Sequence, residues 1–288
     1  MNNKTAVKRE FGRLVQTVRE SLHDNAKDLA AAIAFWAFFA IFPLLIGVIS
    51  LAGYSLESAE LQARIGEAVA SMFPGSANLI RENIEAVVRF RGAMSWVGIA
   101  GLLWSAGKGF GAVTRAVNRA IGVKRTHSPL VSKLRSFLMA VAVSILLILS
   151  IGITVVVEIV LEPGFLARFG LPPFTVPPLQ GWAVGFVIVF LIFALIYRLA
   201  PYVAVRWRQI WPGALLAAVL FEVCKTLFVF YLDRIAHFEA VYGSLSSIIV
   251  LLLWLYVSAL ILVFGAEYNI VRSQATSGPS NGEEEAPE

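Results

Sequence analysis

The C-terminal part of the chain contains the feature that most restricts its fold, a long run of uncharged residues. From Tyr242 to about Ala266 no charged side chain occurs, and the run includes SIIVLLLWLYVSALILVFGA. A helix needs about 20 mostly apolar residues to cross a bilayer. This run therefore predicts a transmembrane helix.

The whole chain has the composition of a membrane protein. Of its 288 residues 58% are hydrophobic and 15% are charged, and the mean hydropathy is +0.75. Soluble domains carry roughly 25% charged residues. We therefore predict an all-α integral membrane protein whose membrane domain covers residues 28–272. Its six transmembrane helices are expected at residues 29–54, 92–111, 136–158, 181–198, 211–232 and 242–267.

Basic residues near the ends of these segments predict the orientation, because cytoplasmic loops are enriched in lysine and arginine. Sixteen of them lie on the side that holds both termini, whereas six lie on the other side. Both termini are therefore predicted to be cytoplasmic. The first apolar run is too long for the core of a cleavable signal peptide, so we expect it to be a retained span.

The regions outside the spans are interpreted from their residue patterns. Residues 1–27 are a basic cytoplasmic segment, and residues 273–288 are expected to be a disordered acidic tail. Between the first two spans, ESAELQARIGEAVASMF and NLIRENIEAVVRF have an apolar residue near every third or fourth position. This spacing predicts an amphipathic helical hairpin on the outer face, either a packed cap or a moving lid.

The connection from Arg115 to Arg135 is basic and contains no acidic residue. Such juxtamembrane segments are attracted to anionic lipid headgroups, at roughly 1 kcal/mol per basic residue. Nucleic acid is the weaker alternative, because no nucleic-acid-binding fold surrounds the segment. The expected partners are therefore membrane lipids and not nucleic acid, and small-residue surfaces leave a homodimer open.

Two charged residues interrupt the fifth span, in the stretch AVLFEVCKTLF. Glu222 and Lys225 are three positions apart, so they share a helical face and can pair. A lone charge at the centre of a membrane helix costs about 2.5–3.5 kcal/mol on insertion scales, so this face is expected to point into the bundle. The pair is either a packing device or the polar lining of a substrate or ion pathway. Candidate aromatic residues for that lining, which have packing as their alternative role, are Tyr231, Trp254 and Tyr256.

Other single residues carry less specific expectations. Asp28 and Glu267 are predicted near the cytoplasmic face, either as helix-end contacts or as a gate. Pro43 lies within the first span, where the lost backbone hydrogen bond predicts a kink.

Catalytic and cofactor motifs are not recognisable in the sequence. The three histidines and Cys224 lack metal-ligand spacing. GLLWSAGKG has five residues, not four, between its first glycine and the GK pair, so it does not match a phosphate-binding loop. No nucleophile with an adjacent base is evident either. We therefore expect no metal, no cofactor and no enzymatic activity.

Several segments resemble the YihY/BrkB family of bacterial membrane proteins. The resemblance is most specific in APYVAVRWRQIWPGALLAA, FEVCKTLFVFYLDR and VYGSLSSIIVLLLWLYVSALILVFGAEYN. DLAAAIAFWAFFAIFPLLIG is similar to the family's first span, and LLWSAGKGFGAVTRAVNRAIG to the exit of its second, although Lys108 and its glycines depart from the pattern. The resemblance implies a six-span protein of the bacterial inner membrane.

What the resemblance implies about activity is less uniform. Family members have been labelled ribonucleases, virulence factors or serum-resistance factors, and lipid export or solute movement has been proposed for others. A ribonuclease is not expected here, because no nucleolytic constellation is present. The leading hypothesis is a transporter or flippase-like exporter of a lipid or another solute that does not itself use ATP. The alternatives are a non-transporting scaffold for envelope assembly and a lipid-modifying enzyme.

Overall fold

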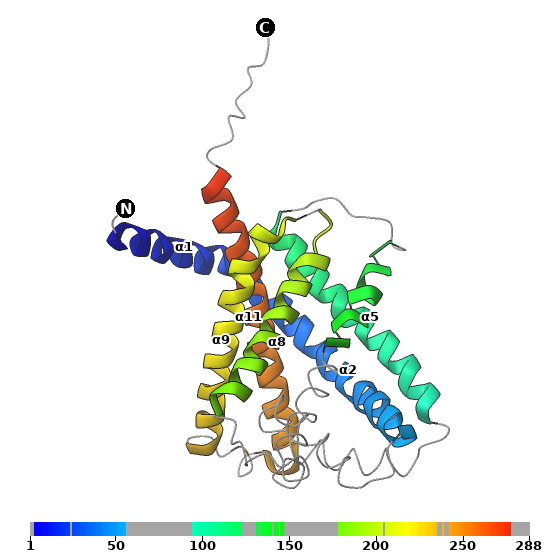
Figure 1. Cartoon of the computed structure of the whole chain (residues 1–288). Coiled ribbons are helices and arrows are strands. Elements are labelled where there is room, and N and C mark those ends of the chain that lie inside the picture. Colours follow the sequence, from blue (N-terminus) through cyan, green and yellow to red (C-terminus); the bar gives the residue numbers. More distant parts are fainter. Residues whose placement is uncertain are drawn as a thin grey trace, which may run out of the picture.

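The computed structural model describes residues 3–23, 25–55, 94–122, 131–132, 134–139, 141–143, 145–146, 178–203, 205–234, 238 and 242–277. Within these ranges the regular elements are helices and no strand occurs (Figure 1). They are α1 (Asn3–His23), α2 (Ala26–Ser55), α5 (Met94–Ala120), α8 (Pro178–Leu199), α9 (Trp207–Arg234), the short 3₁₀ helix η1 (Gly243–Leu245) and α11 (Ser246–Ser277). A shorter apolar helix covers Leu134–Val143.

Helix α11 is the centre of the arrangement. It contacts α1, α2, α5 and α9, while α8 packs on α9 and α2 packs on α5 (Figure 1). Alanines supply much of the buried surface between these helices, among them Ala30, Ala116, Ala217 and Ala259. Small side chains let helix backbones approach closely, which is how helices associate when lipid removes the hydrophobic drive.

The outer face of α9 is as apolar as its inner face. Large hydrophobic side chains stay exposed along one stripe of the helix: Trp211, Leu215, Val219, Val223 and Phe230. A helix at a protein–water boundary normally turns polar residues outward, so a broad exposed apolar face indicates contact with lipid. Among the described residues, Trp207–Arg234 and Ser246–Gln274 are long and apolar enough to cross a membrane.

The predicted spans coincide with helices wherever the structure describes them. Residues 29–54 lie within α2, which continues as a helix through Pro43. Residues 181–198 lie within α8 and 242–267 within η1 and α11, apart from the residue that precedes η1. Of residues 136–158 the structure describes 136–139, 141–143 and 145–146, and these are helical. The predicted hairpin between the first two spans lies outside the described residues.

The C-terminal end of α5 differs from the prediction. The helix was expected to end near residue 111, but it continues to Ala120 because a buried stripe continues through Ala112, Ala116 and Val117. Gly122 then leaves the helix with a φ of 70°, a backbone conformation that favours glycine. Arg115 and Arg119 therefore lie on a helix and not in a loop.

Helix α9 begins earlier than predicted. It starts at Trp207 and not at 211, which places Pro212 inside the helix and not in its first turn. The side-chain Oε1 of Gln209 accepts a hydrogen bond from the backbone N–H of Arg206 at 3.1 Å. This contact satisfies an amide at the helix start in the manner of a capping box, so the helix gains a turn before the proline.

The two terminal segments contain helix, although disorder was predicted only for residues 273–288. Residues 3–23 of the predicted basic segment form α1, and α11 continues to Ser277, past the predicted start of the tail at 273. Helix α1, the ends of α5, α8 and α11 and the start of α9 all lie at one end of the bundle, here called the α1 end (Figure 1).

Candidate functional site

The two charged residues of α9 form an ion pair. Lys225 Nζ lies 2.6 Å from Glu222 Oε2, as the three-residue spacing on a helix permits. The side chain of Glu222 is 7% exposed and that of Lys225 33% exposed. The second carboxylate oxygen, Oε1, is buried and has no hydrogen-bond partner among the described residues.

An aromatic cluster lies beside this pair, between α9 and α11. Trp254 is 1% exposed, and its ring centroid lies 5.2 Å from those of both Phe221 and Phe228. Phe221 and Phe228 flank Glu222 and Lys225 on α9. The charged pair is therefore adjacent to a packed apolar wall.

The other two predicted aromatic residues are not part of this wall. Tyr231 is 38% exposed and stacks edge-on against Phe238 at 6.2 Å. Tyr256 packs instead against the main core of the bundle. Of the three aromatic candidates, only Trp254 is brought to the helix face that carries the pair.

The two acidic residues predicted as a gate have different surroundings. Asp28 is exposed in the first turn of α2, where a carboxylate stabilises the positive end of the helix dipole. Glu267 is 2% exposed within α11.

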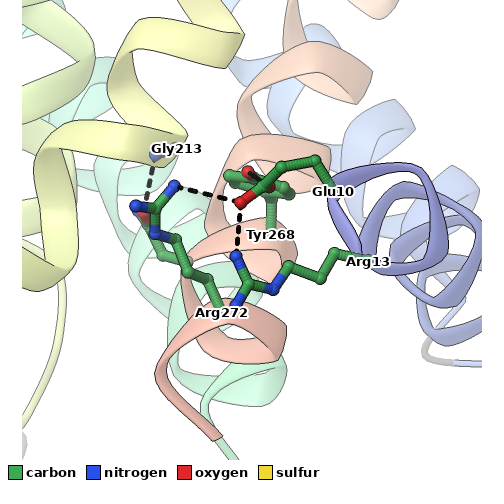
Figure 2. Close-up of polar contacts among 6 residues, drawn as sticks. Glu10, Arg13, Gly213, Tyr268 and Arg272 are labelled. Carbon is green, nitrogen blue, oxygen red and sulfur yellow. Dashed lines mark hydrogen bonds and ion pairs between the residues drawn. The ribbon is translucent and has the colours of Figure 1, made fainter. Parts of the chain in front are cut away.

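A second polar cluster, not predicted from the sequence, joins α1 to α11 (Figure 2). The hydroxyl of Tyr268 donates to Glu10 Oε2 at 2.7 Å, Arg13 pairs with Oε1, and Arg272 lies 3.9 Å from the same oxygen. Burial alone would raise the pKa of Glu10, but the Tyr268 hydrogen bond and the two guanidinium charges outweigh it and lower the pKa. This carboxylate fixes α1 against the bundle.

The helices α9 and α11 touch backbone to backbone beside that cluster. A Cβ added to Gly213 would lie 2.3 Å from the carbonyl oxygen of Gly265, and one added to Gly265 would lie 2.3 Å from the Tyr197 hydroxyl. Only glycine fits at either position. The N–H of Gly213 donates to Asn269 Oδ1 at 2.7 Å, which ties the start of α9 to α11 (Figure 2).

A cavity of about 360 Å³ opens next to this crossing, at the α1 end. The ends of α5, α8 and α11, the connection between α8 and α9, and the start of α9 all contribute to it. Its lining combines apolar walls with amide and hydroxyl groups: Val117, Ile121, Tyr197, Pro201, Val203, Val205, Gln209, Ile210, Ala266, Asn269, Ile270, Ser273 and Gln274.

The connection that walls the cavity is held by long-range hydrogen bonds. Asn118 Nδ2 donates to the carbonyl of Ala200 at 2.9 Å, and its Oδ1 accepts from the N–H of Tyr202 at 2.7 Å. Arg135 donates to the carbonyl of Pro201, and Arg198 to that of Val205. These donors therefore satisfy the carbonyl groups of Ala200, Pro201 and Val205.

Three arginine side chains also cover aromatic rings at this end of the molecule. The guanidinium carbons of Arg135, Arg198 and Arg272 lie 5.5, 5.9 and 5.7 Å from the ring centroids of Tyr202, Trp207 and Trp211. Trp207 and Trp211 are 58% and 45% exposed. Exposed tryptophan beside arginine is typical of the boundary between a membrane and water.

Sequence reasoning missed these features because their parts come from segments far apart in the chain. The available signal was EYNIVRS, a run at the predicted end of the sixth span that places polar and ionisable side chains directly before the predicted tail. Among the described residues no group of three or more His, Cys, Asp or Glu side chains is placed to hold a metal ion.

A bundle with apolar outer faces, buried polar side chains and an aromatic–arginine boundary defines a helical integral membrane protein. The chain belongs to the family described as virulence factor BrkB, whose pattern matches residues 17–288. The resemblance found in the sequence is thereby confirmed.

Relatives within this group share about a quarter of their residues with the chain. It is 28% identical over 255 residues to the ribonuclease-like protein YfkH of Bacillus subtilis, covering 87% of this chain and 91% of that protein. It is 26% identical over 245 residues to a UPF0761 membrane protein of Haemophilus influenzae, covering 85% and 88%. A UPF0761 membrane protein of Alkalilimnicola ehrlichii is 29% identical over 249 residues, which cover 85% of this chain and 54% of that protein. No solved structure matches the chain.

Proposed function

We propose that this protein moves a lipid or another solute across the bacterial inner membrane without using ATP itself, through six spans with both termini in the cytoplasm. The observation that carries the proposal is the second carboxylate oxygen of Glu222, which is buried in a span without a hydrogen-bond partner among the described residues. Ionisable residues inside membrane helices are costly, and they commonly mark substrate or proton pathways.

A packing role alone does not explain why this oxygen is buried without a hydrogen-bond partner among the described residues. Lys225 satisfies one carboxylate oxygen, and Thr226 directs its hydroxyl to the backbone carbonyl of Glu222 and not to the side chain. A buried polar atom without a partner costs about 1–3 kcal/mol. That cost is offset in function if the oxygen accepts a proton or a substrate group during transport.

The proposal has no covalent step. It includes no metal, no cofactor and no nucleic acid, and its partners are membrane lipids, with the basic residues from Arg115 to Arg135 near anionic headgroups. The ribonuclease-like name of YfkH belongs to that relative. RNA cleavage by the purified chain would favour the enzymatic alternative.

Flux through purified protein in liposomes tests the proposal. Lipid scrambling and the uptake of protons and solutes are measured for the wild type, Glu222→Gln and Lys225→Met, with Glu20→Gln on the surface of α1 as the matched control. We expect flux with the wild type and the control, and at least a tenfold loss in both span variants if the pair lies on the pathway, as removal of a proton-transfer group typically costs about 10²–10⁴.

Two outcomes would contradict the proposal. Unchanged flux in both folded span variants would assign the pair to packing. No flux above empty liposomes over a broad panel would favour a membrane scaffold instead. The orientation is tested separately with Asn25→Cys and Ser76→Cys, each in a Cys224→Ser background. Only the cysteine at position 76 should react with a label added from the periplasm.

A further inference from the structure

We propose that the cavity at the α1 end binds the phosphate group of an anionic ligand, either an inner-leaflet phospholipid or a soluble phosphate ester. Three observations carry this inference: the amide groups are oriented as donors, no carboxylate lines the cavity, and the exposed Arg206 and Arg208 flank its lining. Binding is measured without flux, so the inference stands independently of the transport proposal.

The orientation of the lining amides is fixed by backbone N–H groups. The N–H of Gly213 donates to Asn269 Oδ1, and the N–H of Arg206 donates to Gln209 Oε1. An N–H can only donate, so each amide oxygen is held by the protein and each amide nitrogen is available as a donor. Asn269 Nδ2 has no hydrogen-bond partner within the described residues. Gln209 Nε2 makes one hydrogen bond, to Ser273 Oγ at 3.3 Å.

The charges near the cavity favour an anion. None of its lining residues is acidic. Arg206 and Arg208 are exposed beside the lining residues Val205 and Gln209, and neither makes an ion pair in the described part of the chain. The start of α9 adds the positive end of a helix dipole.

Side-chain donors cover carbonyl groups in the connection between α8 and α9 that would otherwise favour a cation. Asn118, Arg135 and Arg198 donate to the carbonyls of Ala200, Pro201 and Val205, and two of these donors carry a positive charge. The amide nitrogens of Asn269 and Gln209 remain as donors in the lining. Hydrogen bonds from such N–H groups to phosphate oxygens are charge-assisted.

The size and position of the cavity suit a headgroup. Its volume of about 360 Å³ lies within the usual range of small-molecule sites, and apolar side chains such as Ile210 and Ile270 form part of the wall. The exposed Trp207 and Trp211 beside it are residues of the kind that lie at headgroup depth.

The test uses the full chain in detergent micelles, with native mass spectrometry to compare bound phosphatidylglycerol with zwitterionic phosphatidylcholine. A second arm titrates glycerol phosphate as a soluble ester. The decisive variant is Asn269→Asp, which keeps the oxygen that accepts from Gly213 but replaces the donor with a negatively charged acceptor. Asn25→Asp makes the same chemical change at an exposed position outside the cavity.

We expect the wild type and Asn25→Asp to prefer phosphatidylglycerol, and Asn269→Asp to bind it at least about tenfold more weakly, as loss of a charged hydrogen bond implies. Binding of the lipid alone identifies a lipid headgroup, whereas binding of glycerol phosphate identifies a soluble ester. If Asn269→Asp does not fold, Gln209→Glu at the exposed rim replaces it. Equal binding of both lipids without binding of the ester, or unchanged binding in the folded cavity variant, would overturn the inference.

Discussion

The pair in the middle of α9 and the polar cluster at the α1 end each place basic side chains beside a carboxylate, but the partners come from different parts of the chain. Glu222 and Lys225 are neighbours on one helix, so their contact depends only on helical spacing. Glu10 instead takes its partners from its own helix and from α11, more than 250 residues later in the chain. The first contact can form in an isolated helix, whereas the second requires the assembled bundle.

The difference predicts which substitutions act locally and which release a whole element. A change at the α9 pair should alter the free energy of unfolding only through the burial of one charge. A change at the crossing between α9 and α11, or at Glu10, should alter how helices are held together. Three experiments sharpen this comparison, beginning with the largest expected effect.

Replacing Gly213 with alanine should cause the largest loss of stability. The new Cβ would lie 2.3 Å from a backbone oxygen of α11, which cannot move away as a side chain can. We expect a loss of about 3 kcal/mol or more, at the upper end of overpacking effects, measured as the free energy of unfolding in detergent. Gly185→Ala on α8 is the matched control, because nothing lies within 4 Å of its added Cβ. Equal stability of the two variants would show that the crossing is looser than described.

Removing only one member of the α9 pair should lower the free energy of unfolding more than removing both charges. Lys225→Met leaves the buried carboxylate unpaired, and we expect a loss of about 1–3 kcal/mol, below the 3–5 of a fully buried pair because Lys225 is one-third exposed. Glu222→Gln combined with Lys225→Met should recover most of this loss. Additive losses in a double-mutant cycle of unfolding free energies would show that the two side chains do not interact.

Acid should loosen α1 without unfolding the bundle, which is the smallest effect. The pKa of Glu10 is lowered from its usual 4.5, so its stabilising contribution is complete above pH 4.5 and is lost as the pH falls through the lower value. Hydrogen exchange of residues 10–20, expressed relative to the intrinsic exchange rate at each pH, should therefore rise below about pH 4.5 while α11 stays protected. In Glu10→Gln this exchange should already be high at neutral pH and should change little with acid. Acid-dependent exchange in that variant would assign the effect to another group.

The helices of the membrane domain followed from local properties of the sequence. Long runs of mainly apolar residues determined where α2, α8, α9 and α11 lie, because lipid penalises unsatisfied backbone and favours helices. The errors were at the ends. Pro212 was interpreted as a first-turn residue, but the side chain of Gln209 caps an earlier start. Side-chain caps and distant partners, not hydropathy, decide where such helices begin and end.

For the candidate site, helical spacing predicted the contact within α9 but not which aromatic side chains lie beside it. Glu222 and Lys225 were predicted to pair, and the structure places them in contact. Trp254 lies beside their helix, but Tyr231 and Tyr256 face elsewhere. Helical spacing predicts which residues of one helix share a face, but it contains no information about the face of the next helix.

By itself the sequence determined a helical membrane protein, the positions of most of its described helices and one charged pair within α9. All three depend on interactions over a few residues, namely hydropathy, helical periodicity and the i,i+3 spacing. Only the tertiary structure decided the glycine crossing of α9 and α11, the docking of α1 through Glu10 and the donor-lined cavity. Each of these joins segments that are distant in the chain, and their contacts arise from packing, which no local pattern specifies.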